Sequence, residues 1–296
     1  MYQKAYGIIE TLAPLHVGAS AGEETGNLNL IFRDQFTQTG IIPGSSIRGR
    51  FRADMREVDR DWANDCYGHE AEKGNSESTT EAQIKFEYAS LVWLPVFCPG
   101  QPVVWVSCPR LLRRYQQITK LPSTDINDLP KRYTVKLEKH RKVLFFNLGY
   151  LKDLKENQKL SDWVPKGLKS PPNNLVIVDD KDISIIHEMA LYRQSRTKLE
   201  DHVKKVEYFF GVEALPEGSI LVFPTAVKQK KDNNQEVQWK EALDTTEWEF
   251  DKPDTNDANL NQFVFKELYF GGLESIGFGR CHVTLSGKYF ETEKKS

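Results

Sequence analysis

Residues 40–56 read GIIPGSSIRGRFRADMR, and this stretch decides how the rest of the chain is interpreted. A Pro-Gly turn is followed by two serines, Ser45 and Ser46. Three apolar residues then recur at helical spacing: Ile47, Phe51 and Met55. The pattern predicts a helix whose N-cap is one of the two serines. The start of such a helix has backbone N–H groups without intrahelical partners and the positive end of the helix dipole, which together favour an anion.

Four arginines belong to the same stretch: Arg48, Arg50, Arg52 and Arg56. Guanidinium groups beside a helix N-terminus are typical of a phosphate-binding site. An ordinary capped surface helix with a solvated basic face would have the same pattern, so both interpretations stay open at this point.

The composition is that of an ordinary soluble protein. The chain has 296 residues, 40 Lys and Arg against 42 Asp and Glu, and a formal net charge of -2, so any nucleic-acid-binding surface must be local. The four cysteines (Cys66, Cys98, Cys108 and Cys281) form no CxxC pair, which indicates neither a zinc site nor a disulfide framework. No signal-peptide pattern or long apolar run is present, so we expect a cytoplasmic protein.

Other segments suggest how the chain is organised. Residues 61–83, 116–174 and 229–259 are polar or charged and are expected to be surface insertions. A helix beginning at Pro109 places a second basic cluster, Arg110, Arg113 and Arg114, on one face. Residues 261–270, NQFVFKELYF, are expected to form a helix, followed by a glycine-rich turn and a last strand.

Six segments, in order along the chain, resemble a known family. They are LAPLHVG (12–18), IIPGSSIRG (41–49), LPVFCPGQPVVWVSCPRLLRR (94–114), LVIVDDKDIS (175–184), VEALPEGSILVF (212–223) and GGLESIGFGR (271–280). The chain resembles the RAMP superfamily of CRISPR proteins, and within it the repeated backbone subunit of Cmr-type, type III effector complexes.

The resemblance implies an α+β fold, a single domain over residues 1–296 with a ferredoxin-like, RNA-recognition-type palm, large insertions and a thumb hairpin. It implies assembly with guide RNA, target RNA, other RAMP subunits, copies of the same chain, a large polymerase-like subunit and a small helical subunit, and no membrane. Residues 116–174 are the first candidate for the thumb and residues 229–259 the second.

The resemblance also assigns an RNA-binding set. The serine-capped helix start and the glycine-rich turn would offer N–H groups to phosphates without reading bases, as a protein accepting any guide must do. The set is Ser45, Ser46, Arg48, Arg50, Arg52, Gly271, Gly272 and Gly277. Binding of this kind needs no cofactor.

Most members of the resembled family cut target RNA with an aspartate in the loop after the LHVG segment. The corresponding stretch here is GNLNLIFRD, which places Leu28, flanked by Asn27 and Asn29, where the aspartate belongs. His16 and Glu213 match other positions near the family's cleavage site, so they are candidate catalytic residues. A carboxylate is needed there to bind Mg²⁺, and an amide is a weak substitute.

Two interpretations of this departure follow. In the favoured one the chain is a backbone subunit that does not cut. In the other it is a metal-dependent endoribonuclease in which Glu23, Glu24 or Asp34 supplies the acid through a shifted loop, or His16 acts as general acid or base, and only then is Mg²⁺ required.

Two further classes remain as alternatives. RAMP endonucleases that process the guide also use the glycine-rich C-terminal turn, although the Cmr-like middle segments argue against them. A phosphate-binding metabolic enzyme would normally carry GxxxxGK[ST] or GxGxxG, and this chain has neither.

Overall fold

The structure is a computed structural model that describes residues 2–18, 28–68, 81–122, 128–139, 141–199, 206–228, 248–250 and 263–287. The helices are α1 (Gly44–Val58), α2 (Arg60–Tyr67), α3 (Pro109–Thr119), α4 (Ile183–Ala190) and the 3₁₀ helices η2 (Gln158–Trp163) and η4 (Glu274–Ile276). The strands before α3 are β1 (Tyr2–Thr11), β2 (Leu28–Asn29), β3 (Ile41–Ile42), β4 (Ile84–Phe86), β5 (Ala89–Phe97) and β6 (Val103–Ser107).

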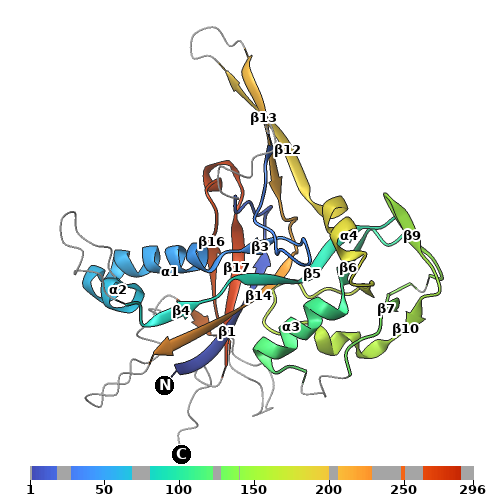
Figure 1. The fold of residues 1–296 in the computed structure, drawn as a ribbon, viewed down its shortest axis with the longest axis horizontal. Coiled ribbons are helices and arrows are strands. Elements are labelled where there is room, and N and C mark those ends of the chain that lie inside the picture. The colour runs from blue at the N-terminus through green and yellow to red at the C-terminus, as the bar shows by residue number, and fades with distance from the viewer. Residues whose placement is uncertain are drawn as a thin grey trace, which may run out of the picture.

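The later strands complete the α+β arrangement (Figure 1). They are β7 (Thr134–Lys136), β8 (Leu144–Phe146), β9 (Gly149–Leu151), β10 (Lys155–Glu156), β11 (Leu175–Ile177), β12 (Tyr192–Leu199), β13 (Val206–Ala214), β14 (Ile220–Lys228), β15 (Glu249–Phe250), β16 (Val264–Tyr269) and β17 (Arg280–Ser286).

Within the described residues, one sheet of twelve strands forms the body of the molecule. Its main path is β10-β7-β11-β6-β5-β14-β1-β17-β16-β15, with β3 beside β5 and β4 beside β14. The N-terminal strand β1 pairs antiparallel with both β14 and β17. The two ends of the sequence therefore meet in the middle of the sheet, which places the loop after β1 next to the turn before β17.

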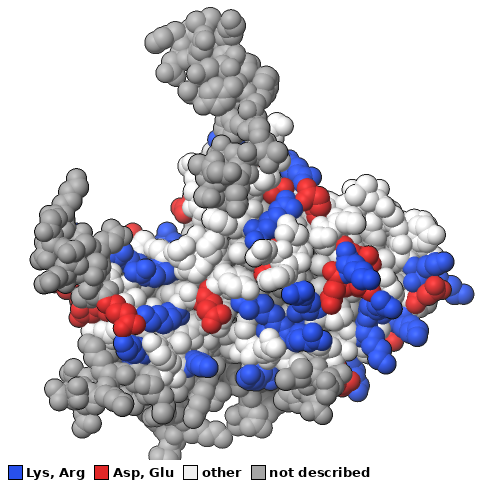
Figure 2. Space-filling model, in the orientation of Figure 1, with Lys and Arg blue, Asp and Glu red and all other residues white. Residues whose placement is uncertain are grey.

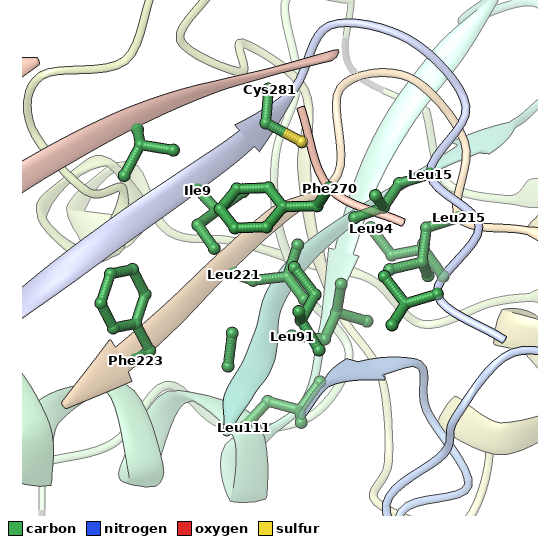
Figure 3. Packing of buried hydrophobic residues seen from close by; sticks show 14 of the residues in the cluster. Ile9, Leu15, Leu91, Leu94, Leu111, Leu215, Leu221, Phe223, Phe270 and Cys281 are labelled. Carbon is green, nitrogen blue, oxygen red and sulfur yellow. The ribbon is translucent and has the colours of Figure 1, made fainter. Parts of the chain in front are cut away.

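Strand β1 is central because side chains on both of its faces are apolar. Ala5 and Ile9 join the larger core cluster, whereas Tyr6 and Ile8 belong to a second cluster on the opposite face. Figure 3 shows part of the larger cluster, where Ile9 lies beside Leu221 and Phe270. Gly7 is required here, since a Cβ at this position would lie 2.1 Å from the ring of Phe223.

The helices cover the two faces of the sheet unequally. Ile47, Phe51 and Met55 of α1 are all buried in the larger cluster, together with residues of α2 and α4. On the second face, α3 contributes Leu112 and Tyr115 and packs with η2. The predicted helix after Pro43 is therefore confirmed by its buried stripe.

A long hairpin of β12 and β13 projects away from the sheet (Figure 1). It pairs from Tyr192 opposite Ala214 to Leu199 opposite Val206, and β2 joins it at Gly211 and Val212. Residues 116–174, the first candidate for the thumb, do not contain this projecting hairpin. In that segment β7 and β10 extend the main sheet, β8 and β9 form a short hairpin of their own, and η2 packs on the sheet through the buried Leu160 and Trp163. Most of 229–259 lies outside the described residues.

The expected helix at 261–270 is a strand, β16, paired with β17. Val264 and Leu268 are buried, a spacing of four that fits a helix as well as a strand. Lys266, between them, is half-buried, and the neighbour β17 supplies a hydrogen-bonding edge. The tertiary pairing therefore decides a pattern that the local sequence leaves ambiguous.

Two other expectations are refined. The insertion at 61–83 begins as helix α2, whose Cys66 and Tyr67 are buried, and residues 69–80 lie outside the described part. All four cysteines are free and buried. None of the described helices is long and apolar enough to cross a membrane.

Candidate nucleic-acid interface

The first candidate feature is the start of α1. The helix is capped by Pro43, whose carbonyl accepts from the N–H groups of Ser46 and Ile47 at 3.0 and 3.2 Å. Neither serine side chain caps the helix, so the predicted serine N-cap is wrong. Proline takes the position because its extended backbone (ψ 143°) turns the chain from β3 into the helix. The hydroxyls of Ser45 and Ser46 have no hydrogen-bond partner among the described residues and stay available to a ligand.

The arginines of α1 are partly committed to the fold. Arg48 donates from Nε to the carbonyl oxygen of Tyr67 at 2.9 Å, and its Nη2 donates to the same oxygen, which ties α1 to the end of α2. Arg50 forms an ion pair with Asp54 one turn later. Arg52 is half-buried. The phosphate-binding role assigned to these arginines stays a prediction, and the structure adds a stabilising role for Arg48.

The glycine-rich turn lies against the loop that follows β1. Gly271 has φ +88° and a Cβ there would lie 2.1 Å from the carbonyl oxygen of His16, so only glycine allows this approach. The N–H of Gly279 donates to the carbonyl of Pro14 at 2.9 Å. Gly271, Gly272 and Gly277 are all exposed. The loop after β1 and the glycine-rich turn thus lie against each other.

His16 is held by the base of the projecting hairpin. Its Nδ1 lies 2.6 Å from the carbonyl oxygen of Glu213 on β13. A carbonyl oxygen only accepts, so Nδ1 carries the proton and Nε2 of the neutral ring is the acceptor. The imidazole is half-buried. This arrangement leaves Nε2 able to accept a proton from a bound group.

The carboxylate of Glu213 is fully buried and neutralised by arginines. Arg33 donates from Nη2 to both Glu213 oxygens at 2.8 Å and from Nη1 to Glu188 at 2.7 Å. Arg193 lies 3.2 Å from the same Glu213 carboxylate and also pairs with Glu188. A buried carboxylate needs such partners because desolvation penalises its charge.

Four residues form a charge cluster around the buried Glu213 carboxylate at the base of the β12–β13 hairpin: Arg33, Glu188, Arg193 and Glu213. Burial alone would lower the pKa of Arg33, but its bonds to Glu213 and Glu188 raise it. Burial would raise the pKa of Glu188, and the pairing with Arg33 lowers it instead. Both groups therefore remain charged. The Glu213 side chain is bound within the protein, which argues against the catalytic role considered for it.

His187 lies next to this cluster and is also fully buried. Its Nε2 accepts from the N–H of Gly40 at 2.8 Å, and Nδ1 has no partner among the described residues. Burial, with a smaller contribution from Arg33, lowers its pKa to about 3, so the ring is neutral. Sequence reasoning did not single out His187, Glu188 or Arg193. No local signal marked them, because their partners lie far away in the chain.

The position expected for a catalytic aspartate lies beside His16. Leu28 and Asn29 form β2 and pair with Gly211 and Val212, one residue before Glu213. Asn27, like the alternative acids Glu23 and Glu24, lies outside the described residues. The third alternative acid, Asp34, accepts from the N–H of Thr37 at 2.8 Å and from its hydroxyl at 2.9 Å, closing its own turn. Burial would raise the pKa of Asp34, but these bonds lower it.

The described residues do not fit a Mg²⁺ ion at this place. No group of three or more His, Cys, Asp or Glu side chains in the described part of the chain is arranged to hold a metal. The one buried carboxylate nearby, Glu213, is held by Arg33 and Arg193. The structure therefore brings together His16, Leu28, Asn29 and Glu213, and none of the residues it describes at this place offers a carboxylate open to a cation.

Comparison with known proteins identifies the class. The model of the RAMP superfamily matches residues 8–282, and the chain belongs to that superfamily. Its α+β palm is the fold of solved Cmr proteins. A type III-B Cmr-beta structure bound to cognate target RNA contains a chain with a TM-score of 0.67 at 19% identity, covering 96% of this chain and 97% of that one.

Two more structures share the fold. A crystal structure of Cmr4 has a TM-score of 0.64 at 17% identity, with 96% of this chain and 99% of that chain covered. Oligomeric Cmr4 from Pyrococcus furiosus has a TM-score of 0.63 at 17% identity and the same coverage. No curated protein sequence matches the chain. In all three structures the likeness covers 96% of this chain.

Proposed function

We propose that this chain is a guide-RNA-binding backbone subunit of a type III CRISPR ribonucleoprotein. It holds guide RNA by its phosphates and shapes the guide-target duplex for antiviral defence. The observation that carries the proposal is the full-length similarity to Cmr-type chains, one of them in a complex bound to cognate target RNA and another from an oligomeric Cmr4. Its partners are then target RNA, other subunits and further copies of itself.

The geometry of the chain supports binding without base reading. The start of α1 offers two serine hydroxyls and N–H groups, and the turn at 271–277 is exposed and rich in glycine. Such groups contact phosphates and sugars equally in every sequence. The hairpin β12–β13 projects from the palm (Figure 1) and has the shape expected of a thumb.

We further propose that the subunit does not cut RNA. Leu28 stands where the family's aspartate is expected, and Glu213 is enclosed by arginines. One observation favours the alternative of a ribonuclease: Nε2 of His16 is free to accept a proton. A metal-dependent version would need a carboxylate from residues 19–27, which include Glu23 and Glu24.

A cleavage assay separates the two. Labelled target RNA is incubated with the guide-loaded complex and Mg²⁺, using wild type and the single variants Asn27→Asp, Leu28→Asp and Asn29→Asp. We expect wild type to bind and leave target intact, and one aspartate variant to produce regularly spaced cuts. Cutting by wild type that is lost in Glu23→Ala, Glu24→Ala or Asp34→Ala would refute the non-cleaving role.

A further inference from the structure

A groove of about 510 Å³ opens beside the first turns of α3. Figure 2 shows Lys and Arg side chains gathered over this helix. The groove is lined on one side by Arg110, Arg113 and Arg114 and on the other by Phe36, Tyr88 and Ser90. None of these residues belongs to the RNA-binding set inferred from the family.

Two of the three arginines are stacked on aromatic rings. The guanidinium carbon of Arg114 lies 4.2 Å from the centroid of Tyr88, and Nε of Arg114 donates to the hydroxyl of Ser90 at 2.8 Å. The guanidinium of Arg110 lies 5.2 Å from the centroid of Phe36. Stacking fixes the plane of each guanidinium and reduces the entropy lost when it binds an anion.

The arginine side chains of the groove form few ion pairs with other described residues of the protein. Arg113 is exposed and has no hydrogen bond or ion pair with the described residues. The guanidinium of Arg110 is also exposed, and no carboxylate within the described part of the chain forms an ion pair with it. Arg114 lies 3.9 Å from Glu87, which is a loose contact. The guanidinium groups of Arg110 and Arg113 therefore face solvent, and that of Arg110 is also held beside the ring of Phe36.

Two carboxylates line the same groove, and both are engaged. Asp34 accepts from its own turn at Phe36 and Thr37. Asp180 accepts from the N–H of Arg110 at 2.9 Å, so it caps the start of α3. A hydrogen-bonded carboxylate keeps its charge, so three arginines against two carboxylates give the lining of the groove a formal charge of +1.

Phe36 is the least expected member of the groove. Its ring is 74% exposed, at the tip of the turn before β3. An exposed phenyl ring with a guanidinium on one side offers its other side to a planar, apolar partner. Unpaired nucleic-acid bases are recognised in this way, because every base has a face that stacks on an aromatic ring.

The groove is connected through β5 to the strand that leads into α1. Strand β3, which leads into α1, pairs with β5 so that Ile41 lies opposite Ser90. Ser90 is the residue that accepts from Arg114. The start of α1 and the groove are therefore joined through neighbouring strands of the sheet, with the buried Ser90 between them.

We propose that this groove, here named the α3 groove, holds a single-stranded stretch of RNA. Arg110, Arg113 and Arg114 bind consecutive phosphates, and one unpaired base stacks on Phe36. The ligand class follows from the combination of guanidinium donors with an exposed aromatic ring. RNA can use both, because its phosphates bind the guanidinium groups and a base stacks on the ring, whereas an acidic protein surface would use only the guanidinium groups. Because the ligand is RNA, the assignment rests on the proposed function.

The test measures the affinity of the full chain for a fluorescein-labelled, mixed-sequence single-stranded RNA by anisotropy over a series of salt concentrations. The variant Arg110→Ala/Arg113→Ala removes two exposed cations of the groove. The matched control Arg141→Ala/Lys142→Ala removes two exposed cations near β8. We expect the groove variant to weaken binding about tenfold and to lower the salt slope by about 1.4, with the control near wild type.

A second pair of variants isolates the ring. Phe36→Ala should lose roughly tenfold affinity, whereas Phe36→Trp should retain it, because stacking survives in the latter. Equal affinities for wild type, Phe36→Ala and the double arginine variant would refute the α3 groove while leaving the proposed function intact. Unchanged RNA affinity together with a changed oligomeric state in ultracentrifugation would show that the groove binds another copy of the chain. Absence of RNA binding by wild type would refute the groove and the proposed function together.

Discussion

Replacing Glu213 by glutamine tests whether this residue stabilises the fold or performs chemistry. The side chain is 0% exposed and that of Arg33, its main partner, is 23% exposed. Glutamine keeps the shape but removes the charge, which leaves the half-buried Arg33 with only Glu188 as an anionic partner. Breaking a buried pair by removing one charge costs about 3–5 kcal/mol, and we expect about 3 kcal/mol because Arg33 keeps Glu188.

The assay is urea unfolding of wild type and Glu213→Gln, with Glu274→Gln as an exposed control in η4. A loss of about 3 kcal/mol corresponds to a fall in Tm of roughly 5–10 °C for a chain of this size. Adding Arg33→Gln to Glu213→Gln should recover part of the loss, since it removes the orphaned charge. Hydrogen exchange should rise first in β12 and β13, because the charge cluster lies at the base of that hairpin.

The reasoning fails if Glu213→Gln unfolds like wild type within about 0.5 kcal/mol, which is the scatter of ordinary surface substitutions. Unchanged stability with lost RNA cleavage would instead make Glu213 a catalytic acid.

Three further predictions concern single groups. Gly271→Ala should cost about 2–3 kcal/mol in urea unfolding, since its Cβ would lie 2.1 Å from a carbonyl oxygen at φ +88°, whereas Gly272→Ala, which has open space, should cost under 1 kcal/mol. The pKa of His187 is about 3 in the folded protein and about 6.5 in the unfolded chain, so only the unfolded chain gains a proton between these values. The free energy of unfolding should therefore be highest above pH 6.5 and lower by about 2 kcal/mol at pH 5. In His187→Gln the free energy of unfolding should depend less on pH over this range. Arg48→Ala should lower the free energy of unfolding by about 2 kcal/mol, because the hydrogen bond to the Tyr67 carbonyl is lost. It should also weaken RNA binding equally for all RNA sequences. A loss of affinity, measured by anisotropy, that differs between RNA sequences would contradict this.

Local patterns predicted the elements whose partners are near in sequence. The helix after Pro43 could be identified because Ile47, Phe51 and Met55 repeat at a spacing of four directly after a Pro-Gly-Ser-Ser start, which is typical of a helix N-terminus. Its cap could not, since Ser45 and Ser46 are good N-caps in general and the backbone of Pro43 took the position. Residue patterns thus identified helix α1 correctly but placed its N-cap at a serine instead of Pro43.

Features that depend on residues far away in the chain could not be predicted from local sequence patterns. The charge cluster joins Arg33, Glu188, Arg193 and Glu213, which are separated by up to 180 residues. The sequence around each of these residues does not indicate which residues it will pair with. Likewise β16 is a strand because β17 lies beside it, and an isolated peptide with the same residues has no such edge.

The site was predicted in part. The resemblance named His16 and the glycine-rich turn as separate candidate sites, and the fold brings them into contact at Gly271. The basic cluster at Arg110 was visible in sequence, but its aromatic partners, Phe36 and Tyr88, come from other segments and needed the fold. The thumb was sought in the longest insertion, whereas the projecting hairpin follows α4 directly.

The central claim is that the protein binds the sugar-phosphate backbone of RNA and therefore accepts any RNA sequence. The most direct measurement is sequencing of the RNA that copurifies with the full chain, combined with affinities for several unrelated single-stranded RNAs over a salt series. The account predicts heterogeneous bound RNA, affinities within about threefold of one another, and binding that weakens steeply with salt. No bound RNA, or a strong preference for one sequence with little salt dependence, would contradict it.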